Sequence, residues 1–528
     1  MEHQDKRTAF FGKYMAVNGE RLCVMAAFLF FLLFSCYRLT AAPLWYDETI
    51  EFYFSRYLTG PIENVTGLNN LYERLIYYSF QPPLYNLVMA VWLLPGESEW
   101  WYRFSGVIFG CISAAGLYKA AAYQMNRKTG ALTVALYPLL YEIMYYFREC
   151  AEYALMLMFM TWTVYFYFRA LKEKGYRNVI LFTICCVLDL YSQYGSAFLV
   201  APLAVSLLVE KWRKSREEIK GLLCAYIAAA LGAGIPLYWF FLRVQISVQA
   251  TGNDLPVEFY HKNVFYDFFK NLSYLFSWNL IDNFSIERFE WLTVLLLAIM
   301  SILAAAVLLW GENGGAKHLI VVNAVSWLLY YVVVKLRIYA YGWFGNRYNI
   351  FFVPVWFLCM VMVVYECVEI IRKRCKKKWP EYALIAVMAC FALFIVALNL
   401  RKMEHVTWKG HTREVVDLWY QLEGYEVFTY VCFGENVNFE YYLTHNDSYR
   451  EEYKDHIYME TGDEISDTEE KTPQEYIEII RAECGGVMPE EIYVSTGNRF
   501  VIADALEMYG YTSEIVYQTN ATLYYFHQ

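Results

Sequence analysis

Residues 21–40, RLCVMAAFLFFLLFSCYRLT, form a nearly uncharged apolar run, and the carboxylate-bearing stretch LWYDE follows at residues 44–48. The run is long enough to cross about 30 Å of hydrocarbon as a helix. Two adjacent carboxylates where a helix leaves a bilayer are costly unless they stay hydrated, bind a ligand or take part in chemistry. We therefore expect a membrane protein with a candidate site at Asp47 and Glu48. The alternative for the pair is an ordinary solvated loop.

The composition is that of a polytopic membrane protein. Of the 528 residues, 58% are hydrophobic and 19% are aromatic. The net charge of −9 is unevenly distributed. Residues 401–528 hold 25 acidic and 9 basic side chains, whereas residues 1–400 hold 28 acidic and 35 basic side chains. The tail is therefore predicted to be an acidic, water-soluble domain. The pattern lacks the basic patch of a nucleic-acid-binding protein.

The apolar runs predict about eleven transmembrane helices. They lie near residues 21–40, 103–124, 130–147, 152–170, 178–191, 196–210, 221–242, 291–310, 318–335, 350–371 and 382–399. Basic residues gather in the loops on the side of the N-terminus, as the positive-inside rule requires. We expect an all-α, multi-pass module over residues 1–400 with a cytoplasmic N-terminus, and an extracytoplasmic domain over residues 401–528.

The first outer loop, residues 41–100, is predicted to hold interfacial helices. Its apolar segment Leu84–Leu94 would form a helix of about 16 Å, roughly half the thickness of the hydrocarbon. The prolines Pro82 and Pro83 suit the first turn of such a helix. The loop is rich in Tyr, Phe and Trp, so it suits an amphiphilic ligand, although an ordinary aromatic belt explains the same residues.

Further polar residues lie at the predicted outer ends of other spans. They are Arg103, Arg148, Glu149, Glu152, Gln193, Lys335, Arg337, Arg347 and Tyr348. Charged groups gathered at one membrane boundary line a cavity or pair with each other, which makes them functional candidates. Lys335 and Arg337 are equally well explained as cationic anchors whose long side chains reach the interface.

The tail is predicted to be a small α/β domain. Residues 426–434, 491–496, 513–518 and 522–527 have the pattern of strands, and residues 472–486 and 498–510 that of helices. The acidic segment 451–470 is expected to be a loop. No phosphate-binding glycine loop and no hydrolase motif occurs in the tail.

Five short motifs follow one another along the outer ends of the predicted spans. They are DE at 47–48, QPPLY at 81–85, YRFSG at 102–106, ECAEYAL at 149–155 and RY at 347–348. In this order they resemble the motifs of the polytopic GT-C glycosyltransferases, in particular the superfamily of protein mannosyltransferases and lipid A aminoarabinose transferases. The resemblance covers roughly residues 20–210 well and 320–400 weakly, and it implies a GT-C-like fold. The tail is outside it.

Two positions depart from the motifs of that superfamily. Gln81 stands where the family has His, and Ala151 stands where an Arg is usual. The His contributes to a metal site in some relatives, so no metal ligand is assigned here. A divalent metal is left open, and no other cofactor is assigned. Arg148, one turn away, is the candidate to replace the cation missing at position 151.

The resemblance implies a reaction and a set of residues. Such enzymes transfer a sugar from a polyprenyl-phosphate donor to a hydroxyl of a glycan, lipid or protein acceptor at the outer face, with inversion. Asp47 is expected to be the general base, and Glu48 to orient it or to bind the acceptor. Cations would stabilise the leaving phosphate. The implied phosphate-binding residues are Arg347, Arg148, Arg103 and Tyr348, and the implied substrate-binding residues are Gln81, Tyr85, Glu149, Glu152, Tyr153 and Gln193.

Two other classes of function compete with a transferase. A transporter or flippase of lipid-linked glycans is expected to have internal repeats and charges near the bilayer midplane. The sequence shows no clear repeat, and its charges gather at the outer boundary. A non-catalytic cell-envelope assembly protein would present its outer domain to partners.

Overall fold

The structure is a computed structural model. It describes residues 2–57, 81–214, 216–246, 290–336, 338–339, 347–374, isolated positions between 379 and 397, 411–432, 434–460, 471–497, 501–519 and 521–528. Contacts divide the chain into two compact units. The helical unit comprises Met1–Tyr37, Leu75–Tyr85 and Arg103–Val406, and the sheet unit comprises Arg38–Arg74, Asn86–Tyr102 and Thr407–Gln528.

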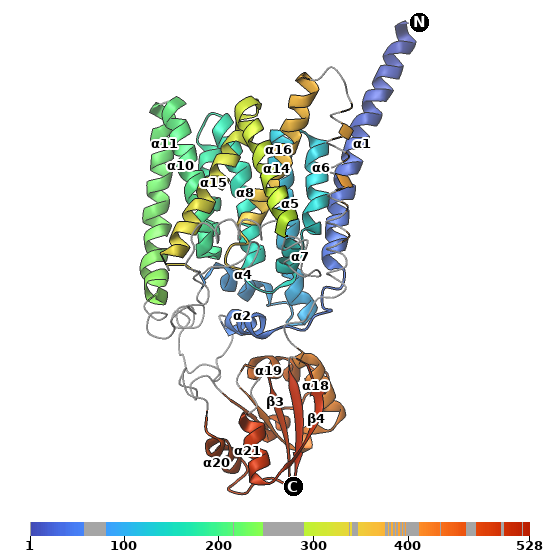
Figure 1. The fold of residues 1–528 in the computed structure, drawn as a ribbon, viewed down its shortest axis with the longest axis vertical. Coiled ribbons are helices and arrows are strands. Elements are labelled where there is room, and N and C mark those ends of the chain that lie inside the picture. The colour runs from blue at the N-terminus through green and yellow to red at the C-terminus, as the bar shows by residue number, and fades with distance from the viewer. Residues whose placement is uncertain are drawn as a thin grey trace. The chain divides into compact units, whose positions relative to one another are not determined.

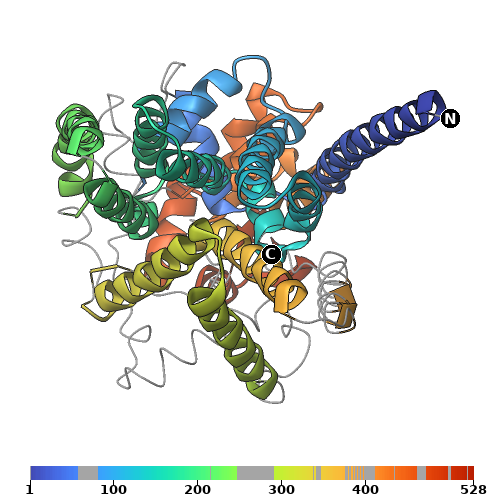
Figure 2. The same ribbon diagram turned by 90° about the horizontal axis from the view of Figure 1, so that it is seen from above.

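The helical unit is built from helices that lie side by side, most of them long and apolar (Figures 1 and 2). They are α1 (Glu2–Cys36), α5 (Glu99–Gln124, whose first turn belongs to the sheet unit), α6 (Arg127–Leu136), α7 (Tyr141–Arg148), α8 (Tyr153–Lys172), α9 (Arg177–Ser192), α10 (Ala197–Lys214), α11 (Arg216–Ala229), α14 (Glu290–Trp310), α15 (Gly314–Lys335) and α16 (Phe352–Arg374). The helix that begins with α11 continues through the π-helical segments Ala230–Gly234 and Leu237–Leu242.

Within the residues that the structure describes, seven helices are long and apolar enough to cross a membrane. The chain is thus a multi-pass membrane protein, as predicted. Of the other predicted spans, α9 has 16 residues, α14 contributes the shorter apolar helix Ala298–Trp310, and 382–399 falls almost wholly outside the described residues. The total of about eleven stays a prediction.

The single helix predicted over 130–147 is wrong. Two helices, α6 and α7, share this stretch and are joined by a short 3₁₀ turn, Tyr137–Leu139. The turn contains Pro138, which has no N–H to donate, and the next residue, Leu140, is extended with ψ 118°. The apolar pattern continues across the break, so hydropathy alone does not reveal it.

The helix predicted in the first outer loop is short. It is α4, Leu84–Trp92, whose nine residues span about 14 Å and follow the two prolines as expected. The indoles of Trp92 and Trp101 stack with 4.5 Å between their centroids, and each indole N–H donates to the other residue's carbonyl oxygen. The aromatic residues predicted at 72–80 lie outside the described residues.

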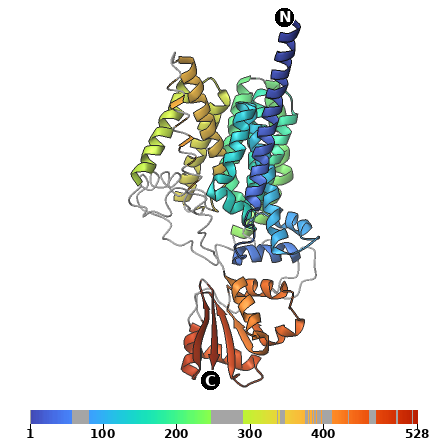
Figure 3. The ribbon, with the colours of Figure 1, turned by 90° about the vertical axis from the view of Figure 1, so that its right-hand side faces the viewer.

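The tail forms a mixed five-stranded sheet with the order β2-β1-β3-β5-β4 (Figure 3). Strands β1 (Phe428–Val431), β2 (Ile457–Met459) and β3 (Glu491–Thr496) are parallel, whereas β4 (Thr512–Gln518) and β5 (Thr522–His527) pair antiparallel. The α/β prediction is confirmed. Strand β2 and the 3₁₀ helix Glu451–His456 correct the expected acidic loop at 451–459, and residues 461–470 are outside the described residues.

Helices cover both faces of this sheet. On one face, α20 (Pro473–Glu483) and α21 (Val501–Tyr509) bury a core that includes Tyr430, Ile480, Val494, Leu506 and Phe526. On the other, α18 (Thr412–Gln421) and α19 (Asn436–Thr444) pack around the buried Trp419, whose indole N–H donates to the Thr429 hydroxyl at 2.9 Å. Helix α20 begins with a capping box between Thr472 and Glu475.

Gly106 allows α5 to approach the end of α7 closely. A Cβ at this position would collide with the backbone oxygen of Phe147, next to Arg148. We expect Gly106→Ala to destabilise the protein by about 1–3 kcal/mol, because the collision involves backbone that cannot turn aside. The measurement is the apparent Tm of the purified full chain in one detergent.

Gly232→Ala is the matched control, since no atom lies within 4 Å of a Cβ built at that helical glycine. Equal Tm values for the two variants would contradict the proposed close approach.

Candidate functional site

The Asp47-Glu48 pair lies in the first turn of α2, Tyr46–Tyr57. The carboxylate of Glu48 accepts a hydrogen bond from the backbone N–H of Trp45 at 3.1 Å, which is the arrangement of a residue that caps its own helix. Glu48 is only 2% exposed, and its carbonyl oxygen accepts a bond from the Tyr102 hydroxyl. Asp47 is only partly buried. The two carboxylates therefore have different environments, and Glu48 has a structural task.

A third carboxylate, Glu51, lies one turn after Asp47 on the same face of α2. It accepts a hydrogen bond of 2.6 Å from the Asn86 amide, and Ser55 donates to its backbone oxygen. Burial raises the pKa of Glu51 to about 7, the Asn86 hydrogen bond opposes this rise, and the charge of Asp47 adds to it. Glu51 is not among the predicted site residues, although it stands at i+4 from Asp47 in the sequence.

Helix α2 is fixed to α19 by its other side chains. The Thr49 hydroxyl donates to the Asn438 side-chain oxygen at 2.5 Å, and both residues are buried. The ring of Phe52 meets the ring of Tyr441 edge to face at 5.0 Å. The Tyr442 hydroxyl accepts from the backbone N–H of Leu44, just before the helix. The carboxylate-bearing helix is thus attached to the C-terminal domain within the same unit.

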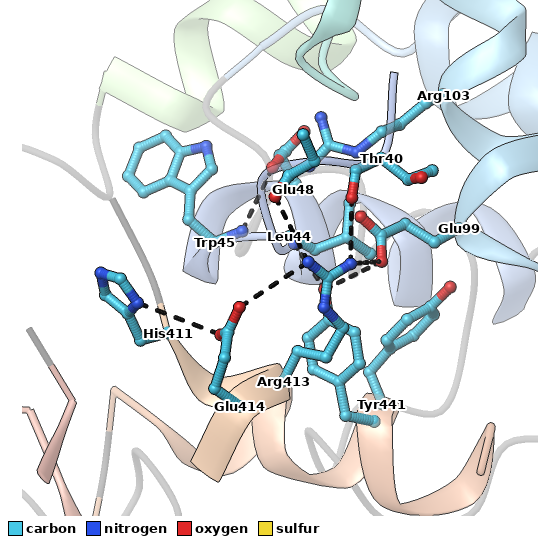
Figure 4. Close-up of polar contacts among 12 residues, drawn as sticks. Thr40, Leu44, Trp45, Glu48, Glu99, Arg103, His411, Arg413, Glu414 and Tyr441 are labelled. Atoms are coloured by element: carbon cyan, nitrogen blue, oxygen red, sulfur yellow. Dashed lines mark hydrogen bonds and ion pairs between the residues drawn. The ribbon is translucent and has the colours of Figure 1, made fainter. Parts of the chain in front are cut away.

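Arg413 makes a second connection in this unit (Figure 4). Its guanidinium donates to the backbone oxygens of Thr40 and Ala41 at 3.1 and 3.4 Å. It also pairs with Glu99 at 3.3 Å and with Glu414 at 3.7 Å. The segment that precedes α2 is therefore held at its backbone by a side chain from α18.

In the helical unit, two predicted phosphate-binding arginines contact backbone carbonyls. Arg148 donates to the carbonyl oxygens of Phe34 and Tyr37 at 3.0 and 2.7 Å, at the C-terminal end of α1. Arg103 donates to the carbonyl oxygen of Arg148. A cation at these carbonyls is favourable because the end of a helix carries partial negative charge.

Arg347 belongs to a different cluster of the helical unit. Its backbone oxygen accepts a hydrogen bond of 2.8 Å from the Gln193 amide, and its guanidinium lies 5.1 Å from the centroid of the Tyr348 ring. Arg347, Glu149 and Glu152 all act electrostatically on the hydroxyls of Tyr146 and Tyr153. The structure therefore brings together the predicted residues Arg347, Tyr348, Gln193, Glu149, Glu152 and Tyr153.

Glu149 and Glu152 are buried at the junction of α7 and α8, with 6% and 3% exposure. Two residues near them were not predicted. Glu142 is buried and acts on Tyr146, and the Tyr146 ring meets that of Tyr153 at 4.7 Å. Both precede the recognised motif at 149–155, which explains why motif comparison missed them.

The remaining predicted substrate-binding residues lie at the 75–85 segment of the helical unit. The backbone oxygen of Gln81 accepts a hydrogen bond of 3.1 Å from Gln245, which in turn accepts one from the Tyr194 hydroxyl. Tyr85 is buried, at 2% exposure. Lys335 is described and lies 5.7 Å from the Tyr331 ring, whereas Arg337 is outside the described residues.

The residues that the structure describes do not form a metal centre. Among the described residues, no three His, Cys, Asp or Glu side chains are grouped so that they could hold an ion. Gln81, at the position of the family's His, is held at its backbone oxygen by Gln245. We therefore derive no step through a metal.

Comparison with known proteins supports the resemblance that the motifs carry. Residues 81–239 match the model of the dolichyl-phosphate-mannose-protein mannosyltransferase family. A comparison with curated proteins finds no match.

Among solved structures, ArnT from Cupriavidus metallidurans bound to undecaprenyl phosphate superposes with a TM-score of 0.53 at 12% identity, over 97% of this chain and 98% of that one. The archaeal oligosaccharyltransferase AglB from Archaeoglobus fulgidus, in complex with an inhibitory peptide and a dolichol-phosphate, gives a TM-score of 0.50 at 10% identity. The match covers 98% of this chain and 75% of that one. At these identities the likeness shows the fold. The chain thus carries a segment, residues 81–239, that matches the model of the dolichyl-phosphate-mannose-protein mannosyltransferase family, and it has a fold like that of ArnT and AglB.

Proposed function

We propose that this protein transfers a sugar from a polyprenyl-phosphate donor to an acceptor hydroxyl, with inversion, and that Asp47 is the general base. The observation that carries the proposal is the division of roles in α2. Glu48 is buried and caps the helix, whereas Asp47, next to it, is only partly buried. A base must reach its substrate, so Asp47 is the better candidate of the two.

The reaction is a single displacement at the anomeric carbon. Asp47 accepts the proton of the acceptor hydroxyl while the hydroxyl oxygen forms a bond to that carbon. The bond from the carbon to the phosphate oxygen breaks, and its electron pair leaves with the phosphate. Phosphate is a good leaving group, so the reaction needs cations near the developing charge rather than a strong general acid.

Arg347 is the first candidate for that cation. Gln193 holds its backbone, and the Tyr348 ring lies beside its guanidinium. Arg148 and Arg103 follow, because their guanidinium groups already donate to carbonyl oxygens. We assign substrate contacts to Gln81, Tyr85, Glu149, Glu152, Tyr153 and Gln193.

We further infer that the N-terminus is cytoplasmic and that residues 401–528 are extracytoplasmic. The support is the distribution of Lys and Arg, which favours the N-terminal side of the helices. The acceptor is then a glycan, lipid or protein at the outer face.

Asp47→Asn should lower sugar transfer about 10²–10⁴-fold, because the amide cannot accept the proton of the acceptor hydroxyl. The assay is transfer and slow donor hydrolysis by the purified full chain in lipid nanodiscs, with a panel of polyprenyl-phosphate sugars. Asp455→Asn, an exposed residue of the same unit, is the control. Transfer at the wild-type rate by Asp47→Asn would show that Asp47 is not the base.

The orientation can be tested by cysteine labelling. A cysteine at Asp455, which is exposed in the sheet unit, should react with a membrane-impermeant maleimide on intact cells above the wild-type background. A cysteine at Lys174, exposed between α8 and α9, should react only after lysis. The reverse pattern would mean that the predicted orientation is inverted.

The raised pKa of Glu51 makes stability depend on pH. The folded state holds the Glu51 proton up to about pH 7, above the ordinary value of 4.5, so the associated stability is fully present below pH 4.5 and is lost as the pH rises through 7. Glu51→Gln, which resembles the protonated form, should therefore be more stable than the wild type at pH 8, by about 1–3 kcal/mol, and similar to it near pH 4.5.

The measurement is the apparent Tm of both proteins at the two pH values in one detergent. Glu478→Gln, an exposed substitution on α20, should change the Tm little at either pH. If Glu51→Gln gained no stability at pH 8, folding would not raise the pKa of the Glu51 carboxyl.

A further inference from the structure

The sheet unit contains a cavity of ≈ 800 Å³ between α2, residues 97–99 and the helices α18 and α19. We propose that this cavity, here named the α2–α19 pocket, binds an uncharged or amino-bearing oligosaccharide as the acceptor. The proposal rests on the proposed function and extends it, because it gives the acceptor a chemical class and a binding site. The residues that carry it are Phe52, Tyr441, Glu97, Asp417, Glu440 and Asn446.

One wall of the pocket is aromatic. Phe52 meets Tyr441 edge to face at 5.0 Å and His445 at 5.6 Å, and His445 stacks on Tyr441 at 4.2 Å. The Tyr441 hydroxyl donates to the backbone oxygen of Glu97 at 3.1 Å, which holds the ring in place. Phe52 and Tyr441 are each only 1% exposed, so these rings give the pocket a rigid base, and the polar groups of the lining are the ones that meet a ligand. A rigid base with convergent polar groups suits a ligand with many hydroxyls, such as a sugar.

The charged lining disfavours an anionic ligand. Arg56 pairs with Glu97, and Arg413 pairs with Glu99, so these two cations of the lining are matched by carboxylates. Asp417 and Glu440 add two further carboxylates, of which Glu440 pairs with Lys454, outside the lining, at 3.8 Å.

Burial raises the pKa of Glu440, and the charge of Lys454 opposes this rise. Carboxylates accept hydrogen bonds from hydroxyl or ammonium groups, whereas a phosphate or a uronic acid would be repelled.

The helix α2 connects the pocket with the proposed base. Asp47 lies in its first turn, and Phe52, Tyr53 and Arg56 line the pocket from its later turns. Nine residues separate Asp47 from Arg56, which corresponds to about 14 Å along the helix. A ligand that reaches from one end to the other is an extended chain. The pocket therefore favours an oligosaccharide over a monosaccharide.

The test is binding of the full chain in nanodiscs, without donor, to an array of immobilised neutral, amino-bearing and uronic-acid oligosaccharides. We expect the wild type to bind neutral or amino-bearing chains. The double variant Asp417→Ala/Asn446→Ala should weaken this binding at least about tenfold, because each lost hydrogen bond to the ligand costs about 1 kcal/mol. Asp447→Ala, an exposed neighbour outside the lining, should bind as the wild type does.

Three results would contradict the proposal that the pocket binds an oligosaccharide. They are no binding to any sugar, preference for uronic acids, and binding that the double variant leaves unchanged. If the double variant unfolds, Asp417→Asn keeps the side-chain shape and should still weaken binding.

The two proposals fail separately. If the protein transfers sugar but binds nothing on the array, only the proposed acceptor pocket is wrong. If it binds the array but transfers sugar from no donor, only the proposed function is wrong. Asp47→Asn should lose transfer and keep array binding.

Discussion

The hydrogen bond from the Trp45 N–H to the Glu48 carboxylate determines where α2 begins. A helix start leaves backbone donors without partners, and a carboxylate in the first turn satisfies one of them and favours the positive end of the helix. Because the start is fixed, the face that carries Asp47 and Glu51 is fixed too. Tyr102, Asn438 and Tyr441 then hold the same helix from the side.

Three carboxylates in one short helix are compatible because their environments differ. The Glu48 carboxylate accepts a hydrogen bond at the start of its own helix, and the Glu51 carboxylate is partly buried and accepts a hydrogen bond from Asn86. Because the pKa of Glu51 is raised to about 7, its carboxyl carries less than a full negative charge at neutral pH. Carboxylates one turn apart repel each other less when one of them is partly protonated, so Asp47 and Glu51 can share one face of α2.

Periodicity predicted much of the architecture, because long apolar runs and alternating strands report burial directly. It identified α1, α5, α8, α15 and α16, and four of the five strands. It failed at Pro138, where the apolar pattern runs across a turn, and at β2, whose three residues lie in an acidic stretch. Periodicity does not predict which side chains are hydrogen-bonded to each other. Asn86, for example, is 35 residues from Glu51, and no local sequence pattern connects them.

The motifs single out three arginines, but they do not reveal what each guanidinium contacts. Arg148 donates two hydrogen bonds to carbonyls at the end of α1, and Arg103 donates to the carbonyl of Arg148 itself. Moving either guanidinium to a phosphate would leave these carbonyls to find other donors. Arg347 is held differently, because Gln193 donates to its backbone oxygen and its guanidinium lies beside the Tyr348 ring. Arg148 and Arg103 therefore connect α1, α5 and α7, and a phosphate that took either guanidinium would compete with these carbonyls.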